Sequence, residues 1–217
     1  LREYGILTPP MAVSFDGRLP KTLPPRPWIT KPAQEDGSIG IFADSVTADP
    51  RKLRSDVRNL HRKFFQPILI ESFIDGRELN VGVVGREVLP LSEIDFSGMP
   101  RGRPKILGYE SKWNYDSPEF RGSQTRCPTD VPAGLANRIK RAGLDTLAAL
   151  NVEGYARVDF RVDTRNRIYV LEVNPNPDIS PDAGLSKMAE AAGWGYDGLI
   201  SRILTFARQR TRTNITP

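Results

Sequence analysis

Two acids, an arginine and an amide stand among apolar residues in the stretch GYARVDFRVDTRNRIYVLEVNPNPDIS, residues 154–180. They are Arg157, Asp159, Glu172 and Asn174. Side chains on a strand alternate between its two faces, so Arg157 and Asp159 share a face, as do Glu172 and Asn174. Carboxylates and amide oxygens are hard ligands that suit Mg²⁺ or Mn²⁺ rather than zinc, and a guanidinium suits a phosphoryl group. These residue types indicate metal-assisted phosphate chemistry.

The polar segment TRNR at 164–167 predicts the turn of a hairpin. A turn centred there places Asp159 opposite Glu172 and Arg157 opposite Asn174. The facing residues of the other parity are then all apolar: Val158, Phe160 and Val162 against Val173, Leu171 and Tyr169. A slip of one residue would spoil both faces, so the sequence predicts this register.

Directly opposed carboxylates repel each other, because cross-strand neighbours lie only about 4.5–5.5 Å apart at Cβ. A divalent cation held by Asp159, Glu172 and Asn174 would remove that repulsion, and Arg157 would contact a phosphoryl group. A solvated sheet face, whose charges pair with Arg161 and with each other, explains the same residues without a ligand. The residues alone leave both interpretations open.

A second polar group consists of Lys31, Glu71 and Glu78, with a Gly/Ser loop at 34–40 that contains Ser38. The backbone N–H groups of such a loop can face an anion. Glu71 stands inside an apolar strand, where a carboxylate is costly unless it is paired. A buried acid beside a strand edge can accept an adenine amino proton, and an acid at a strand start can hold ribose hydroxyls. An ordinary hairpin turn and an internal Lys–Glu ion pair are the alternatives.

The composition is that of a globular protein of one domain, or of one domain with two lobes: 217 residues, 26% charged and 39% hydrophobic. The net charge of +5 is compatible with a nucleic acid or with a polyanionic small ligand such as a nucleotide. Basic and aromatic residues are not interleaved, so nucleic acid is not expected as a partner. The single cysteine, Cys127, fits a reducing, cytoplasmic compartment, and no apolar run has the length of a membrane span.

Helices packed against antiparallel meanders are expected, which is an α+β fold. The predicted elements are a short strand within YGILTPPMAVSF, a strand at Trp28–Lys31, a helix after Asp49, a strand meander over 67–96, a loop-rich segment over 98–128, a helix within 132–152, the hairpin, and one or two helices within 184–210.

In this order the segments resemble the ATP-grasp fold and, within it, the D-alanine–D-alanine ligase family. YGILTPP resembles the entry to the family's central lobe, ITKPAQEDGSIGI its lysine–proline strand and phosphate loop, and ILIESFIDGREL its nucleotide hinge. YESKWNY resembles the segment with a substrate-side lysine, YARVDFRV and YVLEVNPNP resemble the metal hairpin, and MAEAAGWGYDGLISRIL resembles the closing helices. Each motif is modest, but their order along the chain is specific.

The resemblance implies two lobes, each with an antiparallel sheet and helices, and a nucleotide held between them. It implies a central lobe over residues 1–90 and a carboxy-terminal lobe with the metal hairpin over residues 91–217. The chain is interpreted as a fragment that lacks the family's amino-terminal domain, through which a homodimer would form, and a phosphate-binding lysine upstream of Leu1. Whether this fragment is active by itself stays open.

The resemblance also gives each candidate residue a role. Nucleotide contacts are implied for Lys31 at the phosphates, Glu71 at the adenine amino group, the backbone of Phe73 and Ile74 at the adenine edge, and Glu78 at the ribose. Contacts with the transferring phosphoryl group are implied for Ser38 in the lid loop, Lys112 near the developing acyl phosphate, and Arg157. Metal binding is implied for Asp159, Glu172 and Asn174, with Mg²⁺ or Mn²⁺ as the cofactor beside ATP.

The implied activity is that of an ATP-dependent carbon–nitrogen ligase, which joins a small-molecule carboxylate to an amine through an acyl phosphate. An ATP-grasp ligase of secondary metabolism and a non-catalytic nucleotide-binding module are the alternatives.

After Asn174 the chain departs from the family pattern, which continues with a proline–glycine step and a serine that holds the acceptor's carboxylate. Here NPNPDISPDAGLS places Asp178 at the glycine position and Gly184 near the serine position. A carboxylate at that point would repel the carboxylate of an amino acid and attract an amine. The acceptor is therefore not assigned to D-alanine.

Overall fold

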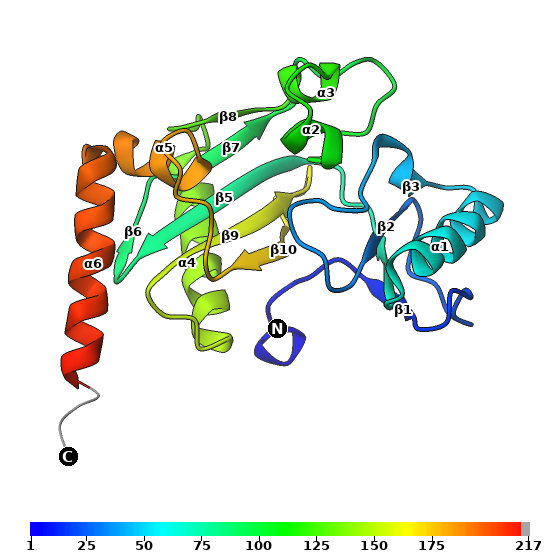
Figure 1. Ribbon diagram of the computed structural model, residues 1–217, viewed down its shortest axis with the longest axis horizontal. Helices are drawn as coiled ribbons and strands as arrows, with labels where there is room; N and C mark the ends of the chain where they lie inside the picture. The colour runs from blue at the N-terminus through cyan, green and yellow to red at the C-terminus, as the bar shows by residue number, and fades with distance from the viewer. Residues whose placement is uncertain (214–217) are drawn as a thin grey trace. The chain divides into compact units, whose positions relative to one another are not determined.

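The computed structural model describes residues 1–213, which group into two compact units. Unit 1 contains Leu1–Thr8, Gly76–Ile94 and the chain from Thr125 onward, and unit 2 contains Pro9–Asp75 and Asp95–Gln124. Each unit has its own sheet with helices, which confirms the predicted α+β class (Figure 1). Strands on both sides of residue 90 join the sheet of unit 1, and the lobe boundary expected there stays a prediction.

The sheet of unit 2 has the strand order β1-β4-β2-β3. Its strands are β1 (Met11–Ser14), β2 (Trp28–Pro32), β3 (Val46–Thr47) and β4 (Ile68–Ser72), and a 3₁₀ turn, η2 (Ala43–Ser45), precedes β3. Helix α1 (Pro50–Phe64) buries Leu53 and Val57 in one cluster with Trp28, Ile68 and Ile70. Lys31 and Glu71 belong to the other parity of β2 and β4, so their side chains lie on the sheet face away from α1.

The amino-terminal end of α1, the helix predicted after Asp49, has a local cap. The Asp49 carboxylate accepts a hydrogen bond from the backbone N–H of Arg51, and Pro50 occupies the first helical position. An aspartate cap satisfies a donor that the helix leaves unpaired, and proline has no N–H to leave unpaired there.

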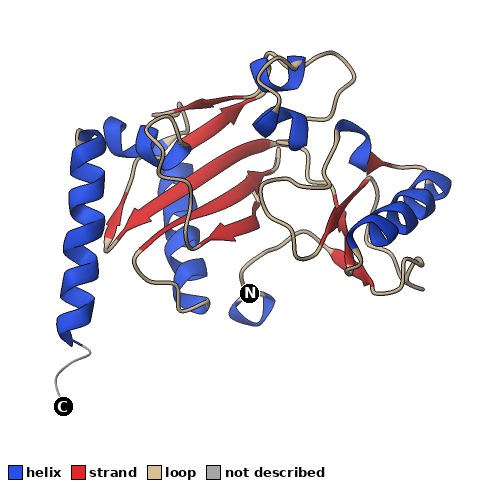
Figure 2. Ribbon diagram, in the orientation of Figure 1, coloured by secondary structure: helices blue, strands red, loops and turns tan. Residues whose placement is uncertain are grey.

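The segment predicted as loop-rich carries short elements between long turns (Figure 2). They are α2 (Tyr109–Trp113), α3 (Pro118–Arg121) and β8 (Gln124–Arg126). Ser117 caps α3 by accepting from the N–H of Phe120 at 2.9 Å.

The sheet of unit 1 has the order β10-β9-β5-β7-β8, and β6 pairs with β5. The strands are β5 (Arg77–Val84), β6 (Glu87–Val88), β7 (Ser92–Asp95), β9 (Tyr155–Val162) and β10 (Ile168–Asn174). The hairpin β9–β10 and the pairs of β5 with β6, β7 and β9 are antiparallel.

Helices cover both faces of this sheet. Helix α4 (Ala133–Ala149) packs on the apolar face (Figure 1). Helices α5 (Gly184–Ala191) and α6 (Gly195–Thr213) bury a second cluster around Val84. A 3₁₀ turn, η1 (Arg2–Tyr4), lies near the amino terminus. Glycines permit the close approach: a Cβ on Gly143 would lie 2.8 Å from Val81, and one on Gly82 would lie 2.6 Å from Leu185. No helix in the described part of the chain combines the length and the apolar character needed to cross a bilayer.

The hairpin turn differs from the prediction by one residue. The predicted pairs Asp159–Glu172, Val158–Val173 and Arg157–Asn174 are confirmed, whereas Phe160 faces Val170 rather than Leu171 and Val162 faces Ile168 rather than Tyr169. Leu171 is the extra residue of a β-bulge. In the turn, Asn166 takes a left-handed conformation with φ 56°, and its N–H donates to the Asp163 carbonyl. The observed turn is therefore longer than the symmetric turn that the sequence predicts.

Gly76 generates a stability prediction. A Cβ there would lie 2.1 Å from the backbone oxygen of Val162, which cannot rotate away, so Gly76→Ala should lower the free energy of unfolding by roughly 1–3 kcal/mol or more. Gly134 lies in the first turn of α4 with no atom within 4 Å of a Cβ, so Gly134→Ala should be neutral or stabilising. Urea unfolding of both variants compares them; equal stability of the two would contradict the close approach.

Candidate functional site

The four polar residues of the hairpin lie together on the β9–β10 face that the alternation predicts. Asp159 and Glu172 are register partners, and so are Arg157 and Asn174. The neighbouring pairs Val158–Val173 and Phe160–Val170 belong to the other face, where Val158, Phe160 and Val170 enter the core with α4. The apolar face therefore holds the register that keeps the two carboxylates opposite each other.

The Asp159 carboxylate accepts hydrogen bonds from three residues. Arg157 donates from Nε to Oδ1 at 2.7 Å and from Nη2 to Oδ2 at 2.8 Å. Asn80, on the adjacent strand β5, donates to Oδ1 at 2.7 Å, and Asn174 donates from Nδ2 to Oδ2 at 3.1 Å. The Asn174 amide oxygen consequently points away from Asp159.

Arg157 is surrounded by acidic groups. Burial lowers the pKa of Arg157, but the charge and hydrogen bonds of Asp159, with the charges of Glu172 and Glu78, raise it above its ordinary value. A guanidinium in this setting stays protonated at any physiological pH. It offsets the repulsion between Asp159 and Glu172, which is the role that the sequence analysis gave to a cation.

The donor set of the hairpin fits a hard divalent cation. Glu172 is exposed, Asp159 is buried between Glu172 and Asn80, and Asn174 adds an amide oxygen. Within residues 1–213 no cluster of three or more His, Cys, Asp and Glu side chains forms a metal site, and the predicted set contains two carboxylates and one amide rather than three acids. The metal assignment therefore stays a prediction with a suitable ligand chemistry.

Glu78 is engaged in an ion pair within unit 1. Its carboxylate accepts from Arg161 Nη2 at 2.8 Å, and both side chains are buried. Arg161 Nη1 also donates to the Gly76 carbonyl at 3.0 Å. The alternative interpretation, in which charges of this face pair with Arg161, therefore holds for Glu78, whereas Asp159 forms its ion pair with Arg157.

Lys31 and Glu71 come together in unit 2. They stand diagonally across β2 and β4, since Lys31 faces Leu69 and Ile29 faces Glu71. Lys31 Nζ lies 2.9 Å from a Glu71 oxygen, so the internal Lys–Glu pair considered from the sequence is present. Both side chains stay partly exposed, at 23% and 11%.

The Gly/Ser loop and α2 are tied to each other in unit 2. Ser38 Oγ donates to the Leu107 carbonyl at 2.6 Å, and Trp113 Nε1 donates to the Gly37 carbonyl at 2.8 Å. Lys112 precedes Trp113 in α2 and is half-buried. These bonds place two predicted phosphate contacts, Ser38 and Lys112, in one connected piece of structure.

Phe73 and Ile74 lie in the short segment between β4 and β5, where the chain passes from unit 2 to unit 1. The backbone N–H of Phe73 donates to the Pro27 carbonyl at 2.8 Å. Both side chains are partly exposed.

The loop after β10 is ordered by hydrogen bonds of its own. Asp178 Oδ1 accepts from the Ser180 N–H at 2.8 Å and from Ser180 Oγ at 2.6 Å, and the Tyr155 hydroxyl bonds to Asn176 Oδ1. The Ser180 hydroxyl and N–H, with the positive charge of Arg157, lower the pKa of Asp178 against the opposing effect of burial. The departure from the family pattern is thus an exposed, ionised carboxylate in a fixed turn.

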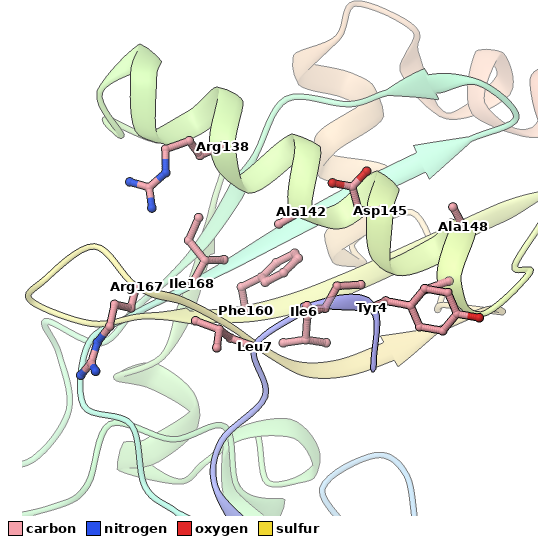
Figure 3. A pocket seen from close by; sticks show the side chains of 13 residues that line it. Tyr4, Ile6, Leu7, Arg138, Ala142, Asp145, Ala148, Phe160, Arg167 and Ile168 are labelled. Carbon is pink, nitrogen blue, oxygen red and sulfur yellow. The ribbon is translucent and has the colours of Figure 1, made fainter. Parts of the chain in front are cut away.

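A pocket of about 620 Å³ opens on the other side of the hairpin (Figure 3). The pocket is lined by residues 4–7, by Arg138 and Asp145 of α4, and by Phe160 and Ile168 of the hairpin. None of the predicted site residues lines it, because Phe160 and Ile168 point to the face away from Asp159.

Residues 23–205 match the family described as D-ala D-ala ligase C-terminus. The chain belongs to this family. The resemblance stated from the motifs is thereby confirmed.

One relative in this family is an uncharacterized protein of Sinorhizobium fredii, y4sG. It is 30% identical over 97% of this chain and 60% of its own length. A D-alanine–D-alanine ligase of Syntrophotalea carbinolica is 33% identical over 95% of the chain and 63% of its own length. The chain therefore spans about three fifths of these relatives.

Solved structures confirm the ATP-grasp fold. The D-alanine–D-alanine ligase of Bacillus anthracis superposes with a TM-score of 0.76 at 25% identity, over 98% of this chain and 66% of that one. The same enzyme complexed with ATP superposes with a TM-score of 0.72 over 98% of this chain and 65% of that one.

Two residues of the hairpin network were not among the predicted ones. Asn80 contacts Asp159 directly, and Ser92 Oγ donates to Asn80 Oδ1 at 3.1 Å. The signal for Asn80 is the spacing of two polar residues in the apolar strand RELNVGVV, which puts it on the same face as Glu78. Ser92 carries no comparable signal, since a serine near a strand start is common.

Asp178 generates a pH prediction. Its folded pKa is depressed, so the bonds to Ser180 contribute stability above the ordinary aspartate pKa of about 4 and lose it as the pH falls through the folded value. Ser180→Ala should raise the Asp178 pKa toward its ordinary value, as measured by ¹³C NMR titration of the carboxyl carbon. The stability difference between Ser180→Ala and wild type should shrink below about pH 4; a difference that grows on acidification would contradict the assignment.

Proposed function

We propose that this chain is the nucleotide- and metal-binding core of an ATP-dependent ligase that joins a small-molecule carboxylate to an amine through an acyl phosphate. The observation that carries the proposal is the hairpin row, with Asp159 opposite Glu172 and Arg157 opposite Asn174, in a chain of this family. The names of the relatives support a ligase, and the ATP complex of the Bacillus anthracis enzyme supports ATP as the nucleotide. The expected compartment is the cytoplasm, where ATP is available.

In the proposed first step, a carboxylate oxygen of the substrate attacks the γ-phosphorus of ATP. A bond forms between them, the bond from γ-phosphorus to the bridging oxygen breaks, and ADP leaves with the electron pair. Charge accumulates on the phosphoryl oxygens, so catalysis consists of positioning and neutralisation. Arg157, Lys31 and Lys112 supply the positive charge, and Ser38 belongs to the loop that closes over the phosphates.

Asp159, Glu172 and Asn174 would hold Mg²⁺ or Mn²⁺, which when bound neutralises phosphate oxygens. Their part is to present oxygen ligands in a fixed row on the hairpin. Arg157 then turns its guanidinium toward the transferring group, which has the planar oxygen arrangement that arginine recognises.

The base and sugar of ATP are assigned to the segment around the β4–β5 connection. Glu71 accepts from the adenine amino group, the Phe73 and Ile74 backbone lines the adenine edge, and Glu78 holds ribose hydroxyls. Glu71 is paired with Lys31 and Glu78 with Arg161, and each carboxylate keeps lone pairs for a ligand.

In the second step an amine nitrogen attacks the acyl carbon, phosphate leaves, and the nitrogen loses a proton to give the amide. Asp178 is proposed to select the acceptor. Its exposed carboxylate is fixed by Ser180 beside the hairpin, and it favours an acceptor that carries positive charge over one with a carboxylate at that point. This supports an acceptor other than D-alanine.

Turnover of the full-length parent protein tests the proposal. ADP release should require an acid substrate from a panel of small carboxylates, and hydroxylamine should trap the acyl phosphate as a hydroxamate. Cationic amines should be better acceptors than amino acids, and Asp178→Gly should reverse that preference. Intact nucleotide binding without ADP release for any acid would contradict the ligase and favour the non-catalytic nucleotide-binding module.

The metal assignment makes a separate prediction. Asp159→Asn and Glu172→Gln should each weaken the Mg²⁺-dependent part of ATP-analogue binding by about 10-fold or more, since each removes a charged ligand. Glu71→Gln serves as the matched change, because it should raise the nucleotide Kd while leaving the Mg²⁺ dependence as in wild type. Isothermal titration with and without Mg²⁺ measures both; unchanged binding in both hairpin variants would remove the metal from these residues.

A further inference from the structure

Asn80 is a buried amide on β5 whose side chain faces the hairpin network. It is 5% exposed, and its backbone stands in register with Asp159 on one side and with Ser92 on the other. Its Nδ2 donates to Asp159 Oδ1 at 2.7 Å. Asn80 therefore belongs to the row of side chains that continues from the hairpin across β5 to β7.

Ser92 holds the end of the Asn80 amide that faces away from Asp159. Ser92 is fully buried, and its Oγ donates to Asn80 Oδ1 at 3.1 Å. The Asp159 carboxylate only accepts hydrogen bonds, so the amide nitrogen faces it and the amide oxygen is left for the Ser92 hydroxyl. Both ends of the Asn80 amide are therefore held by hydrogen bonds.

The three residues that donate to Asp159 differ in what they do to its charge. Arg157 neutralises the carboxylate through two charge-assisted bonds. Asn174 is neutral, but it is itself a predicted metal ligand. Asn80 alone among these three fixes an oxygen of Asp159 while leaving the full negative charge available and having no predicted ligand role of its own.

We propose that Asn80, held in place by Ser92, is a positioning residue that fixes the Asp159 carboxylate for a divalent cation and so frees Arg157 for the phosphoryl group. The inference rests on the proposed function, because it concerns the same metal-binding row. Groups that orient a metal ligand typically change metal affinity by about 10- to 100-fold when they are removed.

The test measures Mn²⁺ binding to the full chain with a non-hydrolysable ATP analogue, through the electron paramagnetic resonance signal of free Mn²⁺. Asn80→Ala should raise the Mn²⁺ Kd about 10- to 100-fold, and Ser92→Ala should raise it by a smaller factor. The double variant should be no weaker than Asn80→Ala, because Ser92 acts through Asn80. Thr146→Val is the control, because Thr146 has a buried hydroxyl in α4 that donates to the Ala142 carbonyl at 2.7 Å. The Mn²⁺ Kd of this variant should match that of the wild type.

Three results would overturn the inference: an unchanged Kd in folded Asn80→Ala, an equal loss in Thr146→Val, or additive losses in the double variant. If Asn80→Ala fails to fold by circular dichroism, Ser92→Ala decides alone, and a wild-type Kd there overturns the proposal. Asp159→Asn separates this question from the proposed function. Mn²⁺ binding that requires Asp159 but not Asn80 removes only the positioning role, whereas wild-type protein that binds no Mn²⁺ removes the metal-dependent function itself.

Discussion

The opposition of Asp159 and Glu172 on adjacent strands is the constraint around which unit 1 is organised. Two carboxylates at cross-strand distance repel, and the fold offsets this by surrounding Asp159 with donors. Arg157 supplies positive charge from the same strand, Asn80 and Asn174 supply neutral N–H groups from the strands on either side, and the next ion pair along the sheet joins Arg161 to Glu78. Asp159 is thus paired within the sheet, and Glu172 is exposed.

The polar row depends on the apolar face behind it. Val158, Phe160 and Val170 are buried with residues of α4, and a register slip would move them to the polar side. Close helix packing is possible because Gly143 and Gly82 present no Cβ to Val81 and Leu185. The apolar residues that pack behind the hairpin thus determine where its polar side chains lie.

The sequence predicted the longer helices, most strands and the part of the hairpin nearest the site, but not the short helices α2 and α3. It did so because the alternation of Arg157, Asp159, Glu172 and Asn174 admits one parity, and because Asp49 and Pro50 form a local helix start. It missed the bulge at Leu171, since a bulge leaves the parity near the site unchanged and only shifts pairs nearer the turn.

Contacts between residues far apart in the chain could not be predicted from the sequence. Asn80 contacts both Ser92 and Asp159 only because β5 lies between β7 and β9, and a local sequence pattern does not determine strand order. The discontinuous grouping into two units has the same cause, since β5 and β7 precede the hairpin by many residues yet share its sheet. The same limit applies to the acceptor: Asp178 is visible as an unusual residue, but its Ser180 partner and fixed turn required coordinates.

The most direct test of the central claim is a crystal structure of the chain with an ATP analogue and Mn²⁺, located by anomalous scattering. We expect an Mn²⁺ peak at roughly 2.0–2.3 Å from oxygens of both Asp159 and Glu172, with the Arg157 guanidinium turned from Asp159 to the phosphates. A bound nucleotide whose Mn²⁺ lies away from both carboxylates, with the Arg157–Asp159 pair intact, would contradict it.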